Sequence, residues 1–180
     1  MLIALGHRKG VGKDAVGAYL RSEYSFRRFA FADRVRFVTK AAFGFTEEQL
    51  TNPLLKDEYD ENIRWSPRKA MQKIGGVFRQ HISSTFWIDH VRRHIMTALE
   101  HEECCVITDL RHKNEAEMVL SLGGYLVKVE RPSVVKNDND NSEIELDGYE
   151  KWAATIRNNG DLQDLYVETD HVVEYLNSLP

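Results

Sequence analysis

The stretch Gly6-His7-Arg8-Lys9-Gly10-Val11-Gly12-Lys13-Asp14 decides the fold that we predict for this chain. The apolar run from Met1 to Leu5 precedes it and predicts a strand, and apolar residues from Ala15 to Leu20 follow it at helical spacing. A strand, a glycine-rich turn and a helix in this order are typical of a phosphate-binding loop, in which backbone N–H groups converge on an anion at the start of the helix. The sequence therefore predicts a nucleotide-binding site.

The stretch departs from the pattern G-x-x-x-x-G-K-[ST] at both ends. His7 stands where the first glycine is expected, with Gly6 one residue earlier, and Asp14 replaces the residue whose hydroxyl binds Mg²⁺. A carboxylate there suits the positive end of a helix and is itself a ligand for Mg²⁺. An ordinary glycine-rich turn is the alternative, but we favour a phosphate site, with Lys13 reaching the phosphates. The predicted ATP-binding residues of the loop are Arg8, Lys9, Gly10, Val11, Gly12, Lys13 and Asp14.

Length and composition predict one α/β domain over residues 1–180. Hydrophobic residues make up 42% of the chain and the net charge is −4, so bulk charge does not favour binding to polyanions. No apolar run approaches the ~18 residues of a membrane span, and the adjacent Cys104 and Cys105 suit reduced, buried thiols. These features predict a cytoplasmic protein that does not enter a membrane.

Four further strands are predicted, separated by helices. Runs of apolar or alternating residues place them at residues 26–31, 104–108, 125–129 and 151–156. A helical insertion covers about residues 33–101, and the Asn- and Asp-rich residues 133–147 predict a mobile, lid-like loop within about 131–147. This order predicts a five-stranded parallel sheet with helices on both faces.

Several helix boundaries carry recognisable signals. Asp33 is a candidate cap for a helix that runs to Phe43, and Thr46 to Gln49 resembles a capping box. Ser66 and Pro67 predict the start of a longer helix, in which Gly75-Gly76 marks a bend or a close approach.

Charged residues follow the strands of the predicted sheet. Ligands of parallel α/β sheets bind at the carboxyl ends of the strands. This rule brings together the loop, Asp33 after the second strand, Asp109 to Arg111 after the third, and Arg131 after the fourth.

The ordered set of motifs resembles the phage-type deoxynucleoside monophosphate kinases. The resemblance begins with the loop and with F-A-D at residues 31–33, and it extends over nearly the whole chain. The further blocks, in the family's order, are F-G-F-T-E-E-Q-L (43–50), W-S-P-R-K-A-M-Q-K-I-G (65–75), T-D-L-R-H-K-N-E-A-E (108–117), E-R-P (130–132), S-E-I-E-L-D (142–147) and N-N-G-D-L (158–162). G-H-x-x-x-x-G-K-D is a familiar form of the loop in that family.

The resemblance implies a nucleoside monophosphate kinase fold and an enzyme that uses ATP and Mg²⁺ to convert a deoxynucleoside monophosphate to its diphosphate. Lys13, Arg68, Arg111 and Asp109 are the catalytic candidates, because phosphoryl transfer requires positioned charge and arginine binds phosphate bidentately. Asp14 and Asp109 are the metal candidates. The alternative for Asp109 is an N-cap of the next helix, and for the two arginines it is a solvated surface.

The remaining candidates divide between acceptor and donor. Arg36 suits the acceptor phosphate or a surface role, and Asp33 suits the acceptor sugar or a cap. Trp65, Gln72 and Trp87 suit the acceptor base, with a core role as the alternative for the aromatic residues. Arg131 suits ATP or the strand end. Asn158 lies where related kinases hold adenine by backbone contacts, although a plain turn also explains it.

Three functions remain open on the sequence alone. The first is a kinase for free deoxynucleoside monophosphates, and the second is a kinase of the same fold that phosphorylates a hydroxyl on a modified base in DNA. The absence of a basic stripe disfavours a nucleic-acid partner. The third is a non-catalytic nucleotide-binding switch, which has no obvious use for Asp109, Arg111 and Arg68. A homodimer is a further hypothesis, since the sequence does not reveal whether the chain dimerises.

Overall fold

The computed structural model describes residues 1–134 and 145–180. Five strands form one sheet in the order β2-β3-β1-β4-β5, and every pair is parallel. This arrangement confirms the predicted fold class. The strands are β1 (Leu2–Gly6), β2 (Arg27–Phe29), β3 (Cys105–Leu110), β4 (Tyr125–Glu130) and β5 (Ala154–Arg157).

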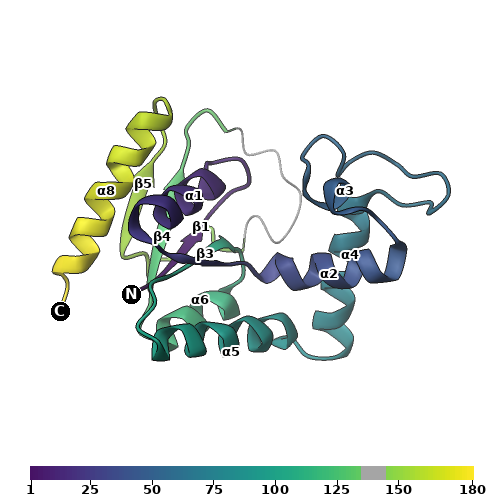
Figure 1. Ribbon diagram of the computed structural model, residues 1–180, viewed down its shortest axis with the longest axis horizontal. Helices are drawn as coiled ribbons and strands as arrows, with labels where there is room; N and C mark the ends of the chain where they lie inside the picture. The colour runs from purple at the N-terminus through teal and green to yellow at the C-terminus, as the bar shows by residue number, and fades with distance from the viewer. Residues whose placement is uncertain (135–144) are drawn as a thin grey trace. The chain divides into compact units, whose positions relative to one another are not determined.

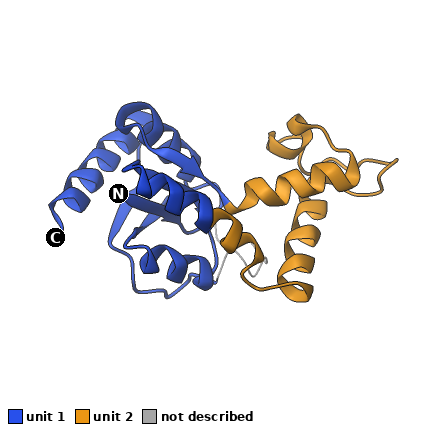
Figure 2. Cartoon of the chain, turned by 60° about the horizontal axis from the view of Figure 1, so that its bottom comes forward, with its two compact units in different colours: residues 1–30, 92–180 blue, residues 31–91 orange. Residues whose placement is uncertain are grey.

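Helices connect the strands and form a second group between β2 and β3. The helices are α1 (Lys13–Tyr24), α2 (Phe31–Phe43), α3 (Glu47–Thr51), α4 (Pro67–His81), α5 (Phe86–Glu100), α6 (Lys113–Ser121) and α8 (Leu162–Ser178). The chain divides into two compact units, one of residues 1–30 and 92–180 and one of residues 31–91 (Figure 2). The second unit overlaps the helical insertion predicted at about residues 33–101.

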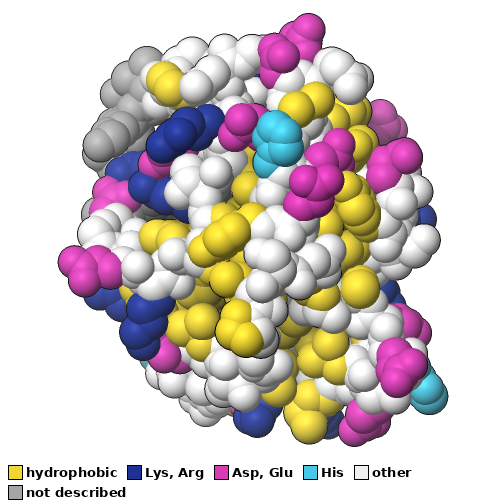
Figure 3. All heavy atoms as spheres, turned by 90° about the vertical axis from the view of Figure 1, so that its left-hand side faces the viewer, with side chains coloured by type: hydrophobic (Ala, Val, Ile, Leu, Met, Phe, Trp, Pro, Cys, Tyr) yellow, Lys and Arg dark blue, Asp and Glu magenta, His cyan; other side chains and the backbone are white. Residues whose placement is uncertain are grey.

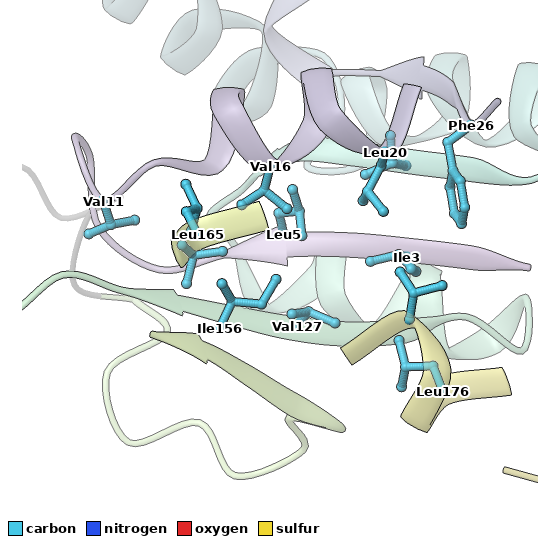
Figure 4. Packing of buried hydrophobic residues seen from close by; sticks show 13 residues of the cluster. Ile3, Leu5, Val11, Val16, Leu20, Phe26, Val127, Ile156, Leu165 and Leu176 are labelled. Carbon is cyan, nitrogen blue, oxygen red and sulfur yellow. The ribbon is translucent and has the colours of Figure 1, made fainter. Parts of the chain in front are cut away.

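The central strand β1 is buried along its whole length because helices cover both faces of the sheet. The helices α1 and α8 pack on one face, and α6 packs on the other (Figure 1). Figure 4 shows the core between the sheet and the helices α1 and α8, where Ile3 and Leu5 meet Val16, Leu20 and Leu176. A strand buried on both faces carries an uninterrupted apolar sequence, as β1 does.

The helix α1 approaches β3 closely at Gly17. A Cβ atom built on Gly17 would lie 2.4 Å from the Cγ2 atom of Thr108 in β3. Only glycine leaves room for this methyl group, so the pair sets how close α1 comes to the sheet.

The second unit confirms two predicted helix starts. The Thr46 side chain accepts from the Gln49 N–H and the Gln49 side chain accepts from the Thr46 N–H, which is the predicted capping box. Ser66 caps α4, with Pro67 as its first residue. The predicted close approach at Gly75-Gly76 is wrong: a Cβ built on Gly75 would have its nearest neighbour, Val35 Cγ1, at 3.8 Å, and Gly76 has none within 4 Å. Phe45, Leu50 and Ala70 form the small core of this unit.

Two predictions about loops had different outcomes. The strand β5 begins at Ala154 and not at Lys151, so the segment before it is longer than expected. Most of the predicted lid-like loop, residues 135–144, lies outside the described residues.

The helix α8 leaves large apolar side chains in contact with solvent: Leu162, Val167 and Tyr175. Figure 3 faces this side of the molecule, where apolar side chains lie among charged ones. Scattered apolar residues are common on protein surfaces, so the homodimer stays a prediction. Among the described residues, no helix combines the length and the apolar character needed to span a membrane.

The contact between Gly17 and Thr108 predicts the effects of three variants on stability. Gly17→Ala should lower the free energy of unfolding by about 1–3 kcal/mol because the new methyl group overpacks the interface. Adding Thr108→Ser, which removes Cγ2, should recover part of that loss. Gly76→Ala is the matched control: Gly76 lies inside α4 with no atom near its built Cβ, so the substitution should stabilise the protein by about 0.5–1 kcal/mol. Urea unfolding of the variants tests this, and equal stability of Gly17→Ala and the parent would contradict it.

Candidate functional site

The loop between β1 and α1 has the backbone shape of an anion-binding loop. It leaves the sheet at Gly6 and enters α1 at Lys13. His7, Gly10 and Gly12 have φ angles of 89°, 77° and 108°. Glycine adopts such angles readily and other residues do so only with strain. His7 therefore takes a conformation that explains why the common pattern has glycine at this position.

Lys13 folds back over this loop. The side chain is only 8% exposed, its Nζ donates to the backbone oxygen of His7 at 2.8 Å, and it also donates to the Arg8 backbone oxygen. The ammonium group is thus held against the loop, next to the N-terminus of α1. Helix dipole and ammonium both make this place positive, so the geometry suits phosphate.

Asn158 supports the loop from the end of β5. Its side chain is buried, and Nδ2 donates to the backbone oxygen of Val11 at 2.9 Å. A Cβ atom on Gly12 would lie 2.7 Å from the same nitrogen, so Gly12 is required for this contact as well as for its φ angle. The sequence indicated backbone contacts to adenine at this position, but it did not predict the hydrogen bond from the Asn158 side chain to the loop.

Arg111 follows the strand beside the loop, as predicted, whereas Asp109 lies inside that strand, near its end. Asp109 lies within β3, and the next residue, Leu110, pairs with Gly6 of β1. The alternative role of Asp109 as a helix N-cap is wrong, because α6 begins at Lys113 with His112 as its N-cap. Asp109 and Arg111 are both half-buried at the end of the sheet where the loop starts.

Glu115 in α6 is a buried carboxylate that the sequence analysis missed. It is 1% exposed, and its Oε2 accepts from the N–H groups of Arg111 at 2.9 Å and His112 at 3.1 Å. These hydrogen bonds make its burial tolerable and fix the backbone from which Arg111 projects. A glutamate three residues after an N-cap is the signal of a capping box and would have identified it.

The other loop candidates differ in exposure. Arg8 is buried and pairs with Asp147 of the segment that precedes β5, whereas Lys9 and Asp14 are exposed. Burial, helped by the charge of Lys128, lowers the pKa of the His7 imidazole. Arg131 is exposed directly after β4, at the same end of the sheet as the loop.

A magnesium site can be assessed from the donor atoms at this end of the sheet. Among the described residues, no group of three His, Cys, Asp or Glu side chains is arranged to hold a metal. Mg²⁺ bound with a nucleotide generally uses one or two carboxylates, with phosphates and waters as its other ligands. Asp14, in the first turn of α1, and Asp109, in β3, each supply a carboxylate of this kind, and a magnesium site at these two residues stays a prediction.

In the second unit, the Arg68 guanidinium makes a bidentate ion pair with the carboxylate of Asp57. Its Nε donates to Oδ1 of Asp57 at 2.6 Å and its Nη2 donates to Oδ2 at 3.0 Å. This bidentate geometry is the one that arginine also uses for phosphate. Because this ion pair is exposed, a surface role and binding of the acceptor phosphate both stay open as predictions for Arg68.

Asp33 and Arg36 form a pair within α2. The helix begins at Phe31, so Asp33 lies in its first turn and the prediction of a cap is wrong. Its Oδ1 accepts from Arg36 Nη1 at 2.8 Å. Because the pair is only half-buried, both side chains have exposed surface.

The three candidates for the acceptor base have different environments. Trp87 is 1% exposed, its Nε1 donates to the Gly75 backbone oxygen, and its ring packs against Phe78 and Phe86. This burial argues against contact with a base and supports the alternative core role. Trp65 is half-buried against the core of the second unit, and Gln72 is exposed on α4.

Comparisons with known proteins agree with this geometry. Residues 51–169 match the family model described as deoxynucleotide monophosphate kinase. A protein of Acanthamoeba polyphaga mimivirus, assigned by name to the same activity, is 31% identical over 180 residues, with 92% of each chain covered. Among solved structures, TT1252 from Thermus thermophilus has a TM-score of 0.54 at 19% identity, covering 98% of this chain and 97% of that one. Shikimate kinase from Aquifex aeolicus has a TM-score of 0.51 at 15% identity, with 98% of each chain covered.

The hydrogen bond from Asn158 to the loop predicts a loss of both stability and nucleotide binding. Asn158→Ala leaves the buried backbone oxygen of Val11 without its donor, which should reduce the free energy of unfolding by about 1–3 kcal/mol. It should also weaken ATP binding, because the loop loses its support. Asn159→Ala is the matched control, since Asn159 is exposed in the same turn. Thermal unfolding and calorimetry of ATP binding test this; unchanged ATP affinity of a folded Asn158→Ala variant would contradict it.

Proposed function

Because the chain belongs to the deoxynucleotide monophosphate kinase family, we propose that it transfers the γ-phosphoryl group of ATP to a deoxynucleoside 5′-monophosphate. The products are ADP and the deoxynucleoside diphosphate. The observation that carries this proposal is Lys13, a buried lysine whose ammonium is held against a loop at a helix N-terminus. A switch protein has less use for Asp109 and Arg111 beside that loop.

The donor phosphates bind along the loop in this proposal. Backbone N–H groups between Lys9 and Asp14 point to the β- and γ-phosphates, and Lys13 contributes a positive charge at short range. The adenine then lies toward the turn that contains Asn158, with Arg131 available to the phosphates from the end of β4.

Catalysis follows from positioned charge. The transferred phosphoryl group spreads negative charge over its equatorial oxygens, so cations fixed in advance stabilise the transition state more than the ground state. Lys13 and Arg111 have this role. Arg111 suits it because Glu115 holds its backbone N–H in place. Mg²⁺, which would be held by Asp14 and Asp109, supplies further positive charge to the phosphates when it is bound.

The acceptor phosphate binds to Arg68. Phosphate can take the place of the Asp57 carboxylate on the guanidinium, because both can accept two parallel N–H hydrogen bonds from arginine. Asp57 thus keeps the side chain extended until the acceptor arrives. Arg36 is a second ligand for this phosphate, Asp33 contacts the sugar, and Trp65 and Gln72 contact the base.

A panel of acceptors tests the proposed function. With MgATP, the enzyme should convert at least one deoxynucleoside monophosphate to its diphosphate, while duplex DNA that carries hydroxymethylated bases should remain unmodified. Lys13→Met keeps the apolar stem and removes the charge, so turnover should fall by about 10²–10³-fold or more, as when one group that stabilises the transition state is lost. Lys151→Met, at an exposed lysine, is the matched control. Phosphorylation of the DNA alone, or ATP binding without any transfer, would contradict the proposal.

Arg68→Lys separates the acceptor from the donor. The substitution retains the positive charge and loses the bidentate fork, so use of the monophosphate should fall about tenfold or more while ATP binding is unchanged. A contact present before and during transfer would raise KM for the monophosphate, and one made only during transfer would lower kcat. Arg64→Lys, at an exposed arginine nearby in the sequence, is the control. Weaker ATP binding with an unchanged KM for the monophosphate would place Arg68 on the donor side.

A further inference from the structure

The segment Glu145–Asp147 connects two parts of the candidate site that are distant in sequence. It belongs to the S-E-I-E-L-D motif and lies directly after the residues that the structure does not describe. Its three side chains have different environments. Glu145 binds the start of α6, Leu146 is buried, and Asp147 pairs with Arg8 of the phosphate-binding loop. We call Glu145–Asp147 the return segment.

The ion pair of Asp147 with Arg8 holds a buried cation in the loop. The Arg8 side chain is 9% exposed, and its Nη2 donates to Oδ2 of Asp147, which is 43% exposed. His7 Nε2 lies 3.9 Å from the other carboxylate oxygen, whereas Arg8 donates a direct hydrogen bond, so Arg8 is the closer cationic partner of Asp147. Removal of one partner from such a pair leaves a buried charge uncompensated. Asp147 therefore fixes Arg8, and with it the first half of the loop.

Glu145 fixes the other side of the site. Its Oε2 lies 2.7 Å from His112 Nδ1, and its Oε1 accepts from the Lys113 N–H at 2.9 Å. Burial opposes ionisation of Glu145, but these hydrogen bonds outweigh it and lower its pKa. Glu115 accepts from the two preceding N–H groups, those of Arg111 and His112. Two carboxylates thus hold three consecutive backbone N–H groups after β3, and one of them comes from the return segment.

We propose that the return segment is a clamp that fixes the phosphate-binding loop relative to the segment carrying Asp109 and Arg111. Asp147 and Glu145 are positioning residues in this clamp: they act on ATP through Arg8 and through the start of α6. The proposal rests on the proposed function only in taking ATP as the nucleotide. The clamp differs from a purely structural role because the carboxylates of Glu145 and Asp147 affect how tightly the protein binds the phosphates of ATP.

In a competing role, Asp147 would weaken ATP binding instead of strengthening it. A carboxylate on Arg8 also resembles a phosphate oxygen, so Asp147 would oppose nucleotide binding if ATP had to displace it. We favour the clamp because Asp147 directly follows Leu146, which is buried, and Glu145, which is hydrogen-bonded to the start of α6, so its backbone is held beside Arg8. The effect of removing the charge on ATP affinity therefore distinguishes the two roles.

Calorimetry of MgATP binding to the full chain tests the clamp with three variants. Asp147→Asn should weaken binding about tenfold, equivalent to about 1.4 kcal/mol, and Glu145→Gln should weaken it in the same direction. Asp147→Glu keeps the charge and should recover most of the affinity. Glu117→Gln is the matched control: Glu117 joins α6 to Tyr149 and Lys151 by hydrogen bonds of 2.9 and 3.0 Å but does not contact the loop. Its MgATP affinity should equal that of the parent.

Steady-state kinetics and unfolding complete the test. KM for ATP should rise in Asp147→Asn while KM for the monophosphate stays unchanged, which loss of stability alone would not produce. Tighter MgATP binding by Asp147→Asn, or equal binding by all variants that thermal unfolding shows to be folded, would overturn the clamp. Because calorimetry needs no acceptor, a parent enzyme that binds MgATP without phosphorylating any monophosphate would overturn the proposed function and leave the clamp to be judged on affinity.

Discussion

The burial of β1 at the centre of a parallel sheet is the constraint on which the candidate site depends. With β3 on one side and β4 on the other, the carboxyl end of β1 is the point from which the loop must leave. The same pairing sets Leu110 opposite Gly6, so Asp109 and Arg111 accompany the loop without any special local sequence. Close packing of α1 against β3 at Gly17 then fixes the position of α1, and with it the point at which the loop ends. Sheet geometry thus positions the charges before any of them interacts with phosphate.

Local signals in the sequence predicted most of the fold. The uninterrupted apolar runs indicated strands buried on both faces, and the capping box at Thr46 and the Ser66-Pro67 start were confirmed because such signals act within one turn of helix. Asp33 and Asp109 show the limit of this reasoning. Each aspartate precedes or enters a predicted helix, but α2 starts earlier than Asp33 and β3 continues beyond Asp109. An aspartate near a boundary does not by itself identify the cap, since packing sets where the element starts.

The contacts that complete the site join residues far apart in the chain. Asn158 and Val11 are separated by 147 residues, and Arg8 and Asp147 by 139. No periodicity or spacing rule pairs such positions, and a polar residue in a turn or an Asp-rich stretch is usually solvated. The sequence could therefore place the loop at the end of the sheet, but it did not indicate which side chains hold the loop in shape.

Three carboxylates, Glu115, Glu145 and Asp147, surround a site that is proposed to bind a polyanion. Each of them accepts hydrogen bonds from backbone N–H groups or from side chains of the site, so its charge is partly compensated by groups that it also immobilises. Lys13 Nζ donates to the backbone oxygens of His7 and Arg8, which carry only partial charges. The carboxylates consequently give the site its rigidity, and Lys13 is the loop cation that we propose for the phosphates. Because the carboxylates and the lysine have these separate roles, the phosphate-binding loop can be locally positive although the whole chain has a net charge of −4.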